Sequence, residues 1–421
     1  MLPLPQHSKE LKKAIWLVSG GPMQFHLAKR ILQLGYALIV SDGKEDAFCR
    51  SLADAFVHAD TFDIDTHKKA VKELQHEFDI VAAINVASDC HETVNEIRIT
   101  LGHNHYPRWV SKVCRRKSEQ RQFFSEKGFL QPTSFATSNF REAKRSARLI
   151  GGSFVVKADD SSGSRGFSLF ESVDEFHLDD FDRARRESST KTVIIEEALA
   201  PDSLRDLPAE LSVESIWIDG NFHPLNAVDR FFPRDSELIG GLLNFQVQAS
   251  AGVEIGHLNP SLRGATEIQE LFQILKKAGV ALGFDQCEGV FPLKADFFLS
   301  AKGPIILEIT PRLSGGWDSS ASSLCRGADF QYAQLLLTID KEAFREEALK
   351  LMRFEEGIAN FAFVLGVPPQ GAKDNIGRTF FIGVGSSPHE AASQAAHNKK
   401  RGQTVMRELS ALLALRGETP E

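Results

Sequence analysis

The chain has 421 residues, more than one hydrophobic core usually organises, so we expect about three packed units. Hydrophobic residues make up 42% and charged residues 25%, with no apolar run near the ~20 residues that cross a bilayer, which excludes a membrane-spanning protein. The formal net charge of -7 provides no field for nucleic-acid binding. Five scattered cysteines without a C-x-x-C pair argue against a disulfide framework or a zinc knuckle, and together with a first segment that lacks a secretory signal they indicate a cytoplasmic protein.

Residues 14–110 predict a Rossmann-like α/β domain. The run AIWLVSGG (14–21) indicates a strand, Phe25, Ala28 and Ile31 keep helical spacing up to Gly35, and YALIVSDG (36–43) indicates a second strand. A further apolar run, DIVAAINVAS (79–88), follows another helical segment. Strands that alternate with helices are typical of a doubly wound parallel sheet.

Three short motifs in this domain have a structural interpretation that we favour over a functional one. SGGPM (19–23) opens a helix after a strand but lacks the third glycine of a dinucleotide-binding fingerprint, so an ordinary turn is favoured. Asp42 stands where a ribose-binding acid could lie, yet Asp is also common turn chemistry. His91 and Glu92 begin like a zinc-protease helix, but Asn95 occupies the position of the second histidine.

Residues 111–345 predict a second, larger α+β unit. A charged helical stretch (111–152) leads into a predicted hairpin, SFVVKADDSSGSRGFSLF (153–170), and a strand, TVIIEEAL (192–199), so we expect a lid subdomain over about 150–198. A strand at 209–218 and a long loop over 231–260 follow. A helix around 268–282 then precedes two apolar strands, FPLKADFFL (291–299) and PIILEIT (304–310).

Residues 350–421 predict a small C-terminal α/β appendage. IANFAFVLG (358–366) and RTFFIGVG (378–385) indicate strands, and SSPHEAASQAA (386–396) opens a helix in which Ser387, Pro388 and Glu390 supply capping chemistry. The sequence assigns no role to this unit.

The loop DDSSGSRGF (159–167) is a candidate phosphate-binding flap. Its glycines and serines follow the strand FVVK directly, so their backbone N–H groups can wrap a polyphosphate while Lys157 adds positive charge. On these residues alone, an ordinary hairpin is an equal alternative.

An acidic pair on the last two strands is a candidate magnesium site. Asp296 lies on the first strand and Glu308 on the second, and a hairpin can bring both carboxylates to one face to hold Mg²⁺ against phosphate oxygens. Asp296 has apolar neighbours, where an unpaired carboxylate is costly. A salt bridge to Arg or Lys is the alternative.

Three features follow one another along the chain. They are Lys157 with the flap, the acidic hairpin, and Arg312 in EITPRLSGG. In that order the chain resembles the ATP-grasp superfamily of carboxylate-amine ligases, with an organisation like that of biotin carboxylases and amino acid ligases, over roughly residues 14–400. The resemblance implies a preATP-grasp domain, then two α+β subdomains that clamp ATP between them, with Mg²⁺ as the metal cofactor. It implies phosphate contacts from Lys117, Lys157 and the flap (Ser161, Ser162, Gly163, Ser164 and Gly166), and adenine contacts from Glu196, Glu197, Ala198 and Leu199.

The resemblance also implies the remaining site residues. Glu210 matches a ribose-binding acid, Asp296 and Glu308 match metal ligands, and Arg312 matches the arginine near the transferred phosphoryl group. Many members have asparagine at the position of Thr310, so a weaker threonine ligand puts a second metal in doubt. Asp229 and Arg230, with Gly315 and Gly316, are expected beside the acceptor; a surface ion pair and a simple turn are their alternatives.

We therefore expect an ADP-forming ligase that joins a carboxylate, amino-acid-like in character, to an amine through an acyl phosphate, with Arg312, Lys157 and Arg230 as catalytic residues. Alternatives are a bicarbonate-using carboxylase, a purine-biosynthesis-type enzyme, and an ATP-binding protein without turnover. A nicotinamide-dependent oxidoreductase is disfavoured by the incomplete fingerprint. The sequence does not fix the oligomeric state, and a homodimer is compatible with it.

Overall fold

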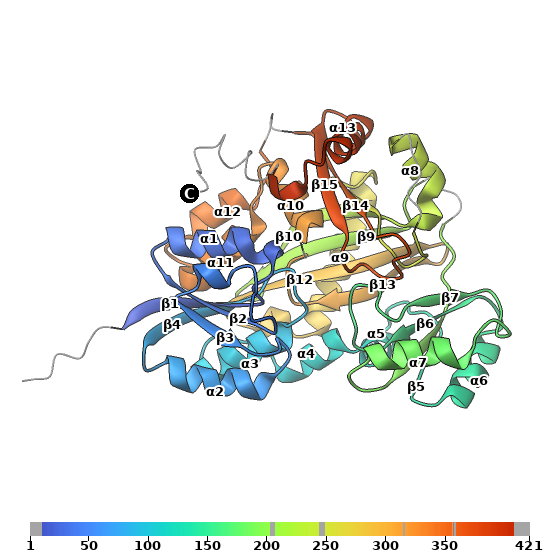
Figure 1. The fold of residues 1–421 in the computed structure, drawn as a ribbon, viewed down its shortest axis with the longest axis horizontal. Helices are drawn as coiled ribbons and strands as arrows, with labels where there is room; N and C mark the ends of the chain where they lie inside the picture. Colours follow the sequence, from blue (N-terminus) through green and yellow to red (C-terminus); the bar gives the residue numbers. More distant parts are fainter. Residues whose placement is uncertain are drawn as a thin grey trace, which may run out of the picture.

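The computed structural model describes residues 11–202, 207–243, 249–314, 316–355, 357 and 359–407. The strands in these residues form a parallel four-stranded sheet, an antiparallel four-stranded sheet and a central antiparallel seven-stranded sheet. Figure 1 shows the first sheet in blue at the left and the second in green at the lower right, with the large sheet between and above them. Within the described ranges, no helix has the length and apolar character of a membrane span.

The N-terminal sheet is parallel and covered on both faces, as the sequence predicted. Its strand order is β3-β2-β1-β4. Trp16 faces α2 and α3, whereas Ile15 and Leu17 face α1 and the later helix α11, because successive side chains of a strand point to opposite faces. The elements are β1 (Lys12–Val18), α1 (Phe25–Gln33), β2 (Ala37–Asp42), β3 (Ala55–His58), α2 (Ile64–Leu74), β4 (Phe78–Ile84), α3 (His91–Leu101) and α11 (Phe330–Asp340).

The small sheet forms the lid and begins earlier in the chain than about residue 150. Its strand order is β5-β8-β6-β7, so the segment from Ser134 belongs to it as well. A cluster of phenylalanines, among them Phe154, Phe176 and Phe181, joins the sheet to its helices. The elements are β5 (Ser134–Thr137), α6 (Phe140–Ile150), β6 (Phe154–Ala158), β7 (Ser168–Phe170), α7 (Leu178–Glu187) and β8 (Val193–Glu197), preceded by α4 (Arg108–Arg115) and α5 (Lys117–Glu126).

The central sheet has the order β13-β12-β9-β10-β11-β14-β15. Helix α9 packs so closely on it that a Cβ at Gly279 would lie 2.4 Å from the Trp217 ring. The strands are β9 (Glu210–Ile218), β10 (Asn221–Phe231), β11 (Gly256–Asn259), β12 (Val290–Ser300), β13 (Gly303–Thr310), β14 (Phe361–Val367) and β15 (Thr379–Gly385). The helices are α8 (Ser236–Leu243), α9 (Ala265–Ala281), α10 (Gly316–Cys325), α12 (Arg345–Leu351) and α13 (Pro388–Arg401).

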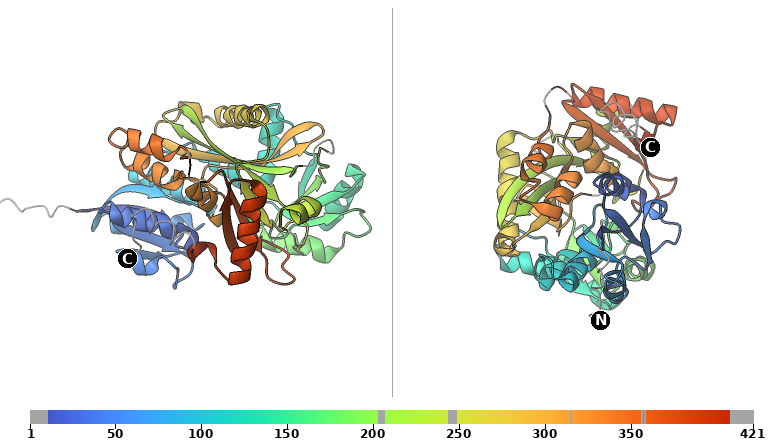
Figure 2. Two further views of the ribbon diagram at one scale, coloured as in Figure 1. Left: turned by 90° about the horizontal axis from the view of Figure 1, so that it is seen from above. Right: turned by 90° about the vertical axis from the view of Figure 1, so that its left-hand side faces the viewer.

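Two regions differ from the sequence predictions. Residues 231–260 are not one long loop but contain α8 and β11, because Leu238 and Leu242 pack against a distant cluster around Phe231 and Phe363. The C-terminal strands do not form a sheet of their own, because β14 pairs with β11 and extends the central sheet. Figure 2 shows these red strands and α13 between the blue and the green parts of the molecule.

Candidate functional site

A cavity lies between the lid and the central sheet, and it gathers half of the site residues predicted from the sequence. Its walls include Lys117 and Lys157, flap residues 161–164, and the charged residues Glu210, Arg230, Asp296 and Glu308. These residues come from α5, the lid hairpin and four strands of the central sheet. The structure therefore brings together the predicted phosphate-binding and metal-binding groups.

The flap is a tight turn anchored at its base. Gly163, Ser164 and Gly166 have φ values of 65°, 60° and 73°, a left-handed conformation that glycine adopts without strain. The Lys117 ammonium donates a hydrogen bond of 2.6 Å to the Ser161 carbonyl, and its backbone N–H donates to the Asp159 carbonyl. The first residue of α5 therefore holds the segment that connects β6 to the flap.

Lys157 belongs to a buried charged triad. Its Nζ lies 2.5 Å from Glu196 Oε2, and Arg121 Nε donates to Glu196 Oε1 at 2.8 Å. Burial favours the neutral acid, but Arg121 and Lys157 together lower the pKa of Glu196 to about 2. Burial also lowers the pKa of Lys157. Lys157 therefore lines the cavity, and the Glu196 carboxylate balances its charge.

Arg121 is a residue that the sequence reasoning missed. Its guanidinium also donates to the carbonyls of Ile306 and Leu307 on β13, at 3.0 and 2.9 Å. It therefore links the lid to the central sheet. The signal was its position four residues after Lys117, which puts both on one face of α5.

The predicted adenine-binding segment is largely engaged within the lid. The Glu196 carboxylate faces Lys157 and Arg121, the Glu197 N–H donates to the Thr133 carbonyl, and the Ala198 N–H donates to the Ser153 carbonyl, both at 2.9 Å. Leu199 directly follows these residues. Neither Glu196 nor Glu197 lines the cavity, so adenine contacts from this stretch would depend on its backbone carbonyls and Leu199.

Arg230 is at the centre of a charged network on the cavity floor. It lies 2.9 Å from Asp296, 2.6 Å from Glu254 and 3.4 Å from Glu210. Burial opposes its charge, yet Asp296, Glu254 and Glu210 raise the pKa of Arg230 above its ordinary value. Glu210 also pairs with Arg234. Both Glu210 oxygens are therefore engaged by arginines, so a ribose hydroxyl would have to share them.

The acidic pair lies in register, since Asp296 is directly opposite Glu308 on β12 and β13. Asp296 is saturated: Ser212 Oγ donates to one oxygen at 2.6 Å, and Lys294 Nζ donates to the other at 2.7 Å. Burial raises the pKa of Asp296, but Arg230 and Lys294 outweigh this effect and hold the pKa well below its usual range. The salt-bridge alternative thus describes Asp296 well.

Glu308 differs from Asp296 because its carboxylate makes no ion pair or hydrogen bond with the part of the chain that the structure describes. Thr310 is 1% exposed, its hydroxyl lies 3.4 Å from His91 Nδ1, and it does not line this cavity. No group of three His, Cys, Asp or Glu side chains that could hold a metal occurs within the described ranges. The donor set fits one Mg²⁺ ion at Glu308 that keeps several waters and phosphate ligands, but not two ions.

Arg312 is held by the N-terminal domain. Its Nε donates to Asp89 Oδ1 at 2.7 Å, and its Nη2 lies 2.5 Å from the same oxygen. Burial raises the pKa of Asp89, but Arg312 outweighs this and holds the pKa well below its usual range. Asp89 follows the carboxyl end of β4, where ligands bind in parallel α/β sheets, and this position was the signal that the sequence reasoning missed.

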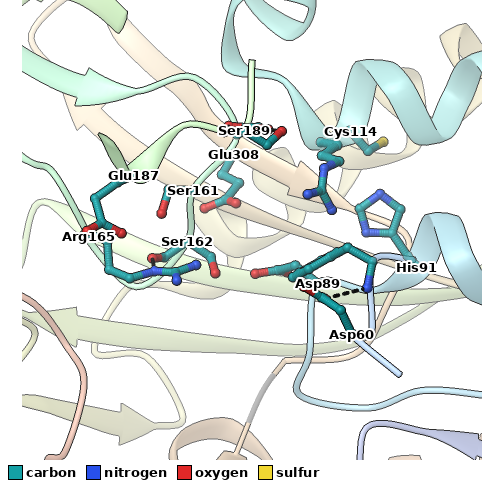
Figure 3. Close-up of a pocket in the computed structure, with 13 residues that line it drawn as sticks. Asp60, Asp89, His91, Cys114, Ser161, Ser162, Arg165, Glu187, Ser189 and Glu308 are labelled. Atoms are coloured by element: carbon teal, nitrogen blue, oxygen red, sulfur yellow. Dashed lines mark hydrogen bonds between the residues drawn. The ribbon is translucent and has the colours of Figure 1, made fainter. Parts of the chain in front are cut away.

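A second cavity of about 250 Å³ adjoins the first, and the two share Ser161, Ser162, Arg165 and Glu308. Figure 3 shows Asp89 and His91 on one side of this cavity and the flap residues on the other. Asp60, Arg115, Asp160 and Glu187 complete its charged lining. Asp60 follows β3 as Asp89 follows β4, so the edge of the N-terminal sheet forms one wall.

Three further predicted residues, Asp229, Gly315 and Gly316, do not line these cavities or fall outside the described structure. Asp229 is fully buried and accepts hydrogen bonds from Ser261 Oγ at 2.6 Å and from the Leu262 N–H at 2.7 Å. Burial raises the pKa of Asp229 to about 6. It fastens the connection between β11 and α9, on the face opposite to Arg230. Gly316 begins α10, and Gly315 lies outside the described residues.

Solved structures resemble the fold of this chain, whereas no protein-family model and no curated protein matches its sequence. An ADP complex of N5-carboxyaminoimidazole ribonucleotide synthetase has a TM-score of 0.65 at 13% identity, covering 93% of this chain and 97% of that chain. L-amino acid ligase from Bacillus licheniformis has a TM-score of 0.63 at 15% identity, with coverage of 86% and 82%. Phosphoribosylglycinamide synthetase from Anaerococcus prevotii has a TM-score of 0.60 at 16% identity, with the same two coverages.

Each similarity extends over most of both chains. At identities of 13–16%, the similarity shows the fold alone. This fold is the one that the order of the sequence motifs indicated. The chain has the ATP-grasp fold.

Proposed function

We propose that the chain is an ATP-dependent ligase that activates a carboxylate as an acyl phosphate and joins it to an amine, with release of ADP and phosphate. The observation that carries this proposal is the junction of two cavities at Glu308 and the flap. One cavity has the lysines and the glycine-rich turn suited to phosphates, and the other has room for a second substrate. A phosphoryl group held at the junction is within reach of both.

ATP occupies the cavity between the lid and the central sheet. The flap backbone, Lys117 and Lys157 hold the phosphates, because main-chain N–H groups and ammonium groups neutralise their charge. Glu308 would hold Mg²⁺, whose charge would offset that of the phosphate oxygens. Arg230 and Arg234 give the cavity floor further positive charge.

In the first step, a carboxylate oxygen of the substrate attacks the γ-phosphorus. The bond from that phosphorus to the bridging oxygen breaks, and ADP leaves. Arg312 pairs with Asp89, which lines the second cavity, and this pairing fixes its guanidinium plane beside the place where charge develops. In the second step, the amine attacks the acyl carbon, phosphate leaves with the bonding electrons, and the amine proton passes to the phosphate.

The charges of the second cavity support an amino-acid-like substrate. Arg115 and Arg165 can receive a carboxylate, while Asp60 and Glu187 can receive an ammonium group, so a zwitterion meets complementary charges. A purely anionic substrate would meet more carboxylates than it could tolerate.

The test is a screen for ADP release over pairs of amino acids and amines, with bicarbonate as a separate arm and mass spectrometry of the products. The proposal predicts ADP release that requires both a carboxylate and an amine, with a product in which water has been lost between them. Stimulation by bicarbonate with a carboxylated product would indicate a carboxylase instead. ATP binding without ADP release in every arm would indicate a binding protein and would overturn the proposal.

A further inference from the structure

The hairpin loop between β14 and β15 reaches across to the ATP flap. In Figures 1 and 2 the red loop runs from the C-terminal strands toward the green segments of the lid. Its contact residue is Asn375, more than two hundred positions after the flap in the chain. We propose that Asn375 is a positioning residue that holds the flap closed over ATP, which gives the C-terminal part of the chain a role in the reaction. This inference rests on the proposed function.

Asn375 uses its backbone and both ends of its side chain in this contact. Its N–H donates to the Gly163 carbonyl at 2.9 Å, and its Nδ2 donates to Ser164 Oγ at 3.3 Å. Its Oδ1 accepts a hydrogen bond of 2.9 Å from the Glu254 N–H. One amide side chain thus joins the flap to the segment that leads into β11.

Asn375 contacts the part of the flap that has left-handed backbone conformations. Gly163 and Ser164 both have positive φ values, so this turn has a backbone shape that a non-glycine residue adopts only when surrounding contacts hold it. Asn375 meets the carbonyl of one residue and the hydroxyl of the other. A Cβ at Gly163 would lie 3.9 Å from the Asn375 Cβ, so the two segments are in van der Waals contact.

A second contact closes the flap farther along. Phe167 lies so near Gly252 that a Cβ at position 252 would come within 2.6 Å of its ring. Ser250 Oγ, two residues before Gly252, donates to the Ala372 carbonyl at 3.1 Å. The flap, the segment 250–254 and the hairpin loop therefore form one packed unit at the mouth of the ATP cavity.

The same loop is connected to the charged network on the cavity floor. Arg378 donates to the Glu254 carbonyl at 2.7 Å and to the Asn375 carbonyl at 3.3 Å. The Glu254 carboxylate binds Arg230, which in turn binds Asp296. When the flap meets Asn375, the segment that orients Arg230 is therefore engaged as well.

Flap closure matters for the proposed chemistry because water hydrolyses an acyl phosphate before the amine arrives. A flap without its contact to Asn375 would open more often and release phosphate without forming product. The proposal therefore predicts a loss of coupling between ADP release and product, and not only a slower reaction.

The test compares Asn375→Ala with Ile376→Ala in the full chain. Ile376 is the neighbouring residue on the same loop, and it is 59% exposed, so its truncation leaves the flap contact intact. In Asn375→Ala we expect roughly tenfold more ADP per product and a KM for ATP raised by a similar factor, because two hydrogen bonds to groups at the site are lost. Ile376→Ala should match the wild type, and equal melting temperatures would show that both variants fold.

A second measurement does not depend on turnover. A non-hydrolysable ATP analogue should protect the flap from tryptic cleavage after Arg165 in the wild type and in Ile376→Ala, and roughly tenfold less in Asn375→Ala. If no substrate pair releases ADP, the proposed ligase function fails while this protection assay still decides the role of Asn375. Equal protection in all three proteins with bound analogue would overturn the inference.

Discussion

Asp89 and Arg312 form a part-buried ion pair between the N-terminal sheet and the segment after β13, with Arg312 Nε 2.7 Å from Asp89 Oδ1. Asp89 lies at the edge of the N-terminal parallel sheet, and Arg312 follows the last strand of the acidic hairpin. A guanidinium held by a carboxylate keeps a fixed plane, which a lone arginine on a loop does not. The N-terminal domain therefore helps to orient a group in the candidate site.

Removing the charge of Asp89 should impair turnover more than stability. In Asp89→Asn the side chain keeps its shape but no longer balances Arg312, so we expect kcat/KM to fall roughly 10- to 100-fold through misplacement of the guanidinium. Asp54→Asn is the matched control, since Asp54 forms an exposed pair with Lys12 at 2.7 Å. Kinetics of ADP release within twofold of the wild type would show that Asp89 has no positioning role.

Arg121 should be important for stability because its loss leaves Glu196 with only half of its charge compensation. We expect Arg121→Leu to lower the free energy of unfolding by about 3 kcal/mol, and a second change, Glu196→Gln, to recover part of that loss. Arg185→Leu is the control, because Arg185 pairs with Asp182 on the surface and exposed pairs contribute less than about 1 kcal/mol. Urea unfolding followed by circular dichroism measures all three, and additive effects of the two buried changes would contradict the coupling.

Stability should fall on the acid side partly because of His91. Burial, with smaller contributions from Arg312 and Arg115, lowers the pKa of His91 to about 4, against an opposing effect of Asp89. The unfolded chain therefore binds a proton near pH 6.5 that the folded chain takes up only near pH 4, so protonation favours unfolding across that window.

The substitution His91→Asn should remove this contribution, which amounts to roughly 3 kcal/mol between pH 7 and pH 4. Unfolding free energies at pH 7 and pH 5 should therefore differ less in His91→Asn than in the wild type. His105→Asn, at an exposed position, should keep the wild-type difference. An unchanged pH dependence in His91→Asn would mean that His91 has the same pKa in the folded and the unfolded chain.

The elements that the sequence predicted well are those with a local signal. Alternation in FVVK and the glycines after it indicated the hairpin of Lys157, and the order of strands and helices indicated the fold class, which the solved structures confirm. The hairpin of Asp296 and Glu308 also followed from a short turn between two apolar strands, although a one-residue register shift beside Asp296, which the sequence did not indicate, places the two residues opposite each other. In each case neighbours in sequence determine the arrangement.

The contacts that the sequence did not predict join segments far apart in the chain. Nothing near Arg312 points to Asp89, and nothing near β14 shows that it pairs with β11 and not with a separate sheet. The expectation for Asp229 rested on its neighbour Arg230, but strand alternation sends the two side chains to opposite faces. Pairings of this kind depend on how whole layers pack, which local patterns do not encode.

Glu308 should be required for turnover if it is the free carboxylate that receives the metal. Glu308→Gln keeps the size of the side chain but removes its charge, so we expect ADP release to fall by roughly 10²-fold or more while the melting temperature changes little. Glu288→Gln, at an exposed position close in the chain, is the control. Near-wild-type ADP release by Glu308→Gln would remove this residue from the metal site.

Thr310 provides the complementary test, because the resemblance makes it a metal ligand whereas its hydroxyl lies against His91 and it lines neither cavity. Thr310→Val has nearly the same shape and lacks the hydroxyl oxygen. Since that hydroxyl makes only a 3.4 Å contact, we expect a loss of less than about 1 kcal/mol in stability and an Mg²⁺ concentration for half-maximal ADP release within about twofold of the wild type. A clearly higher Mg²⁺ requirement in Thr310→Val would show that the threonine turns toward the metal when ATP binds, and would restore a second protein ligand beside Glu308.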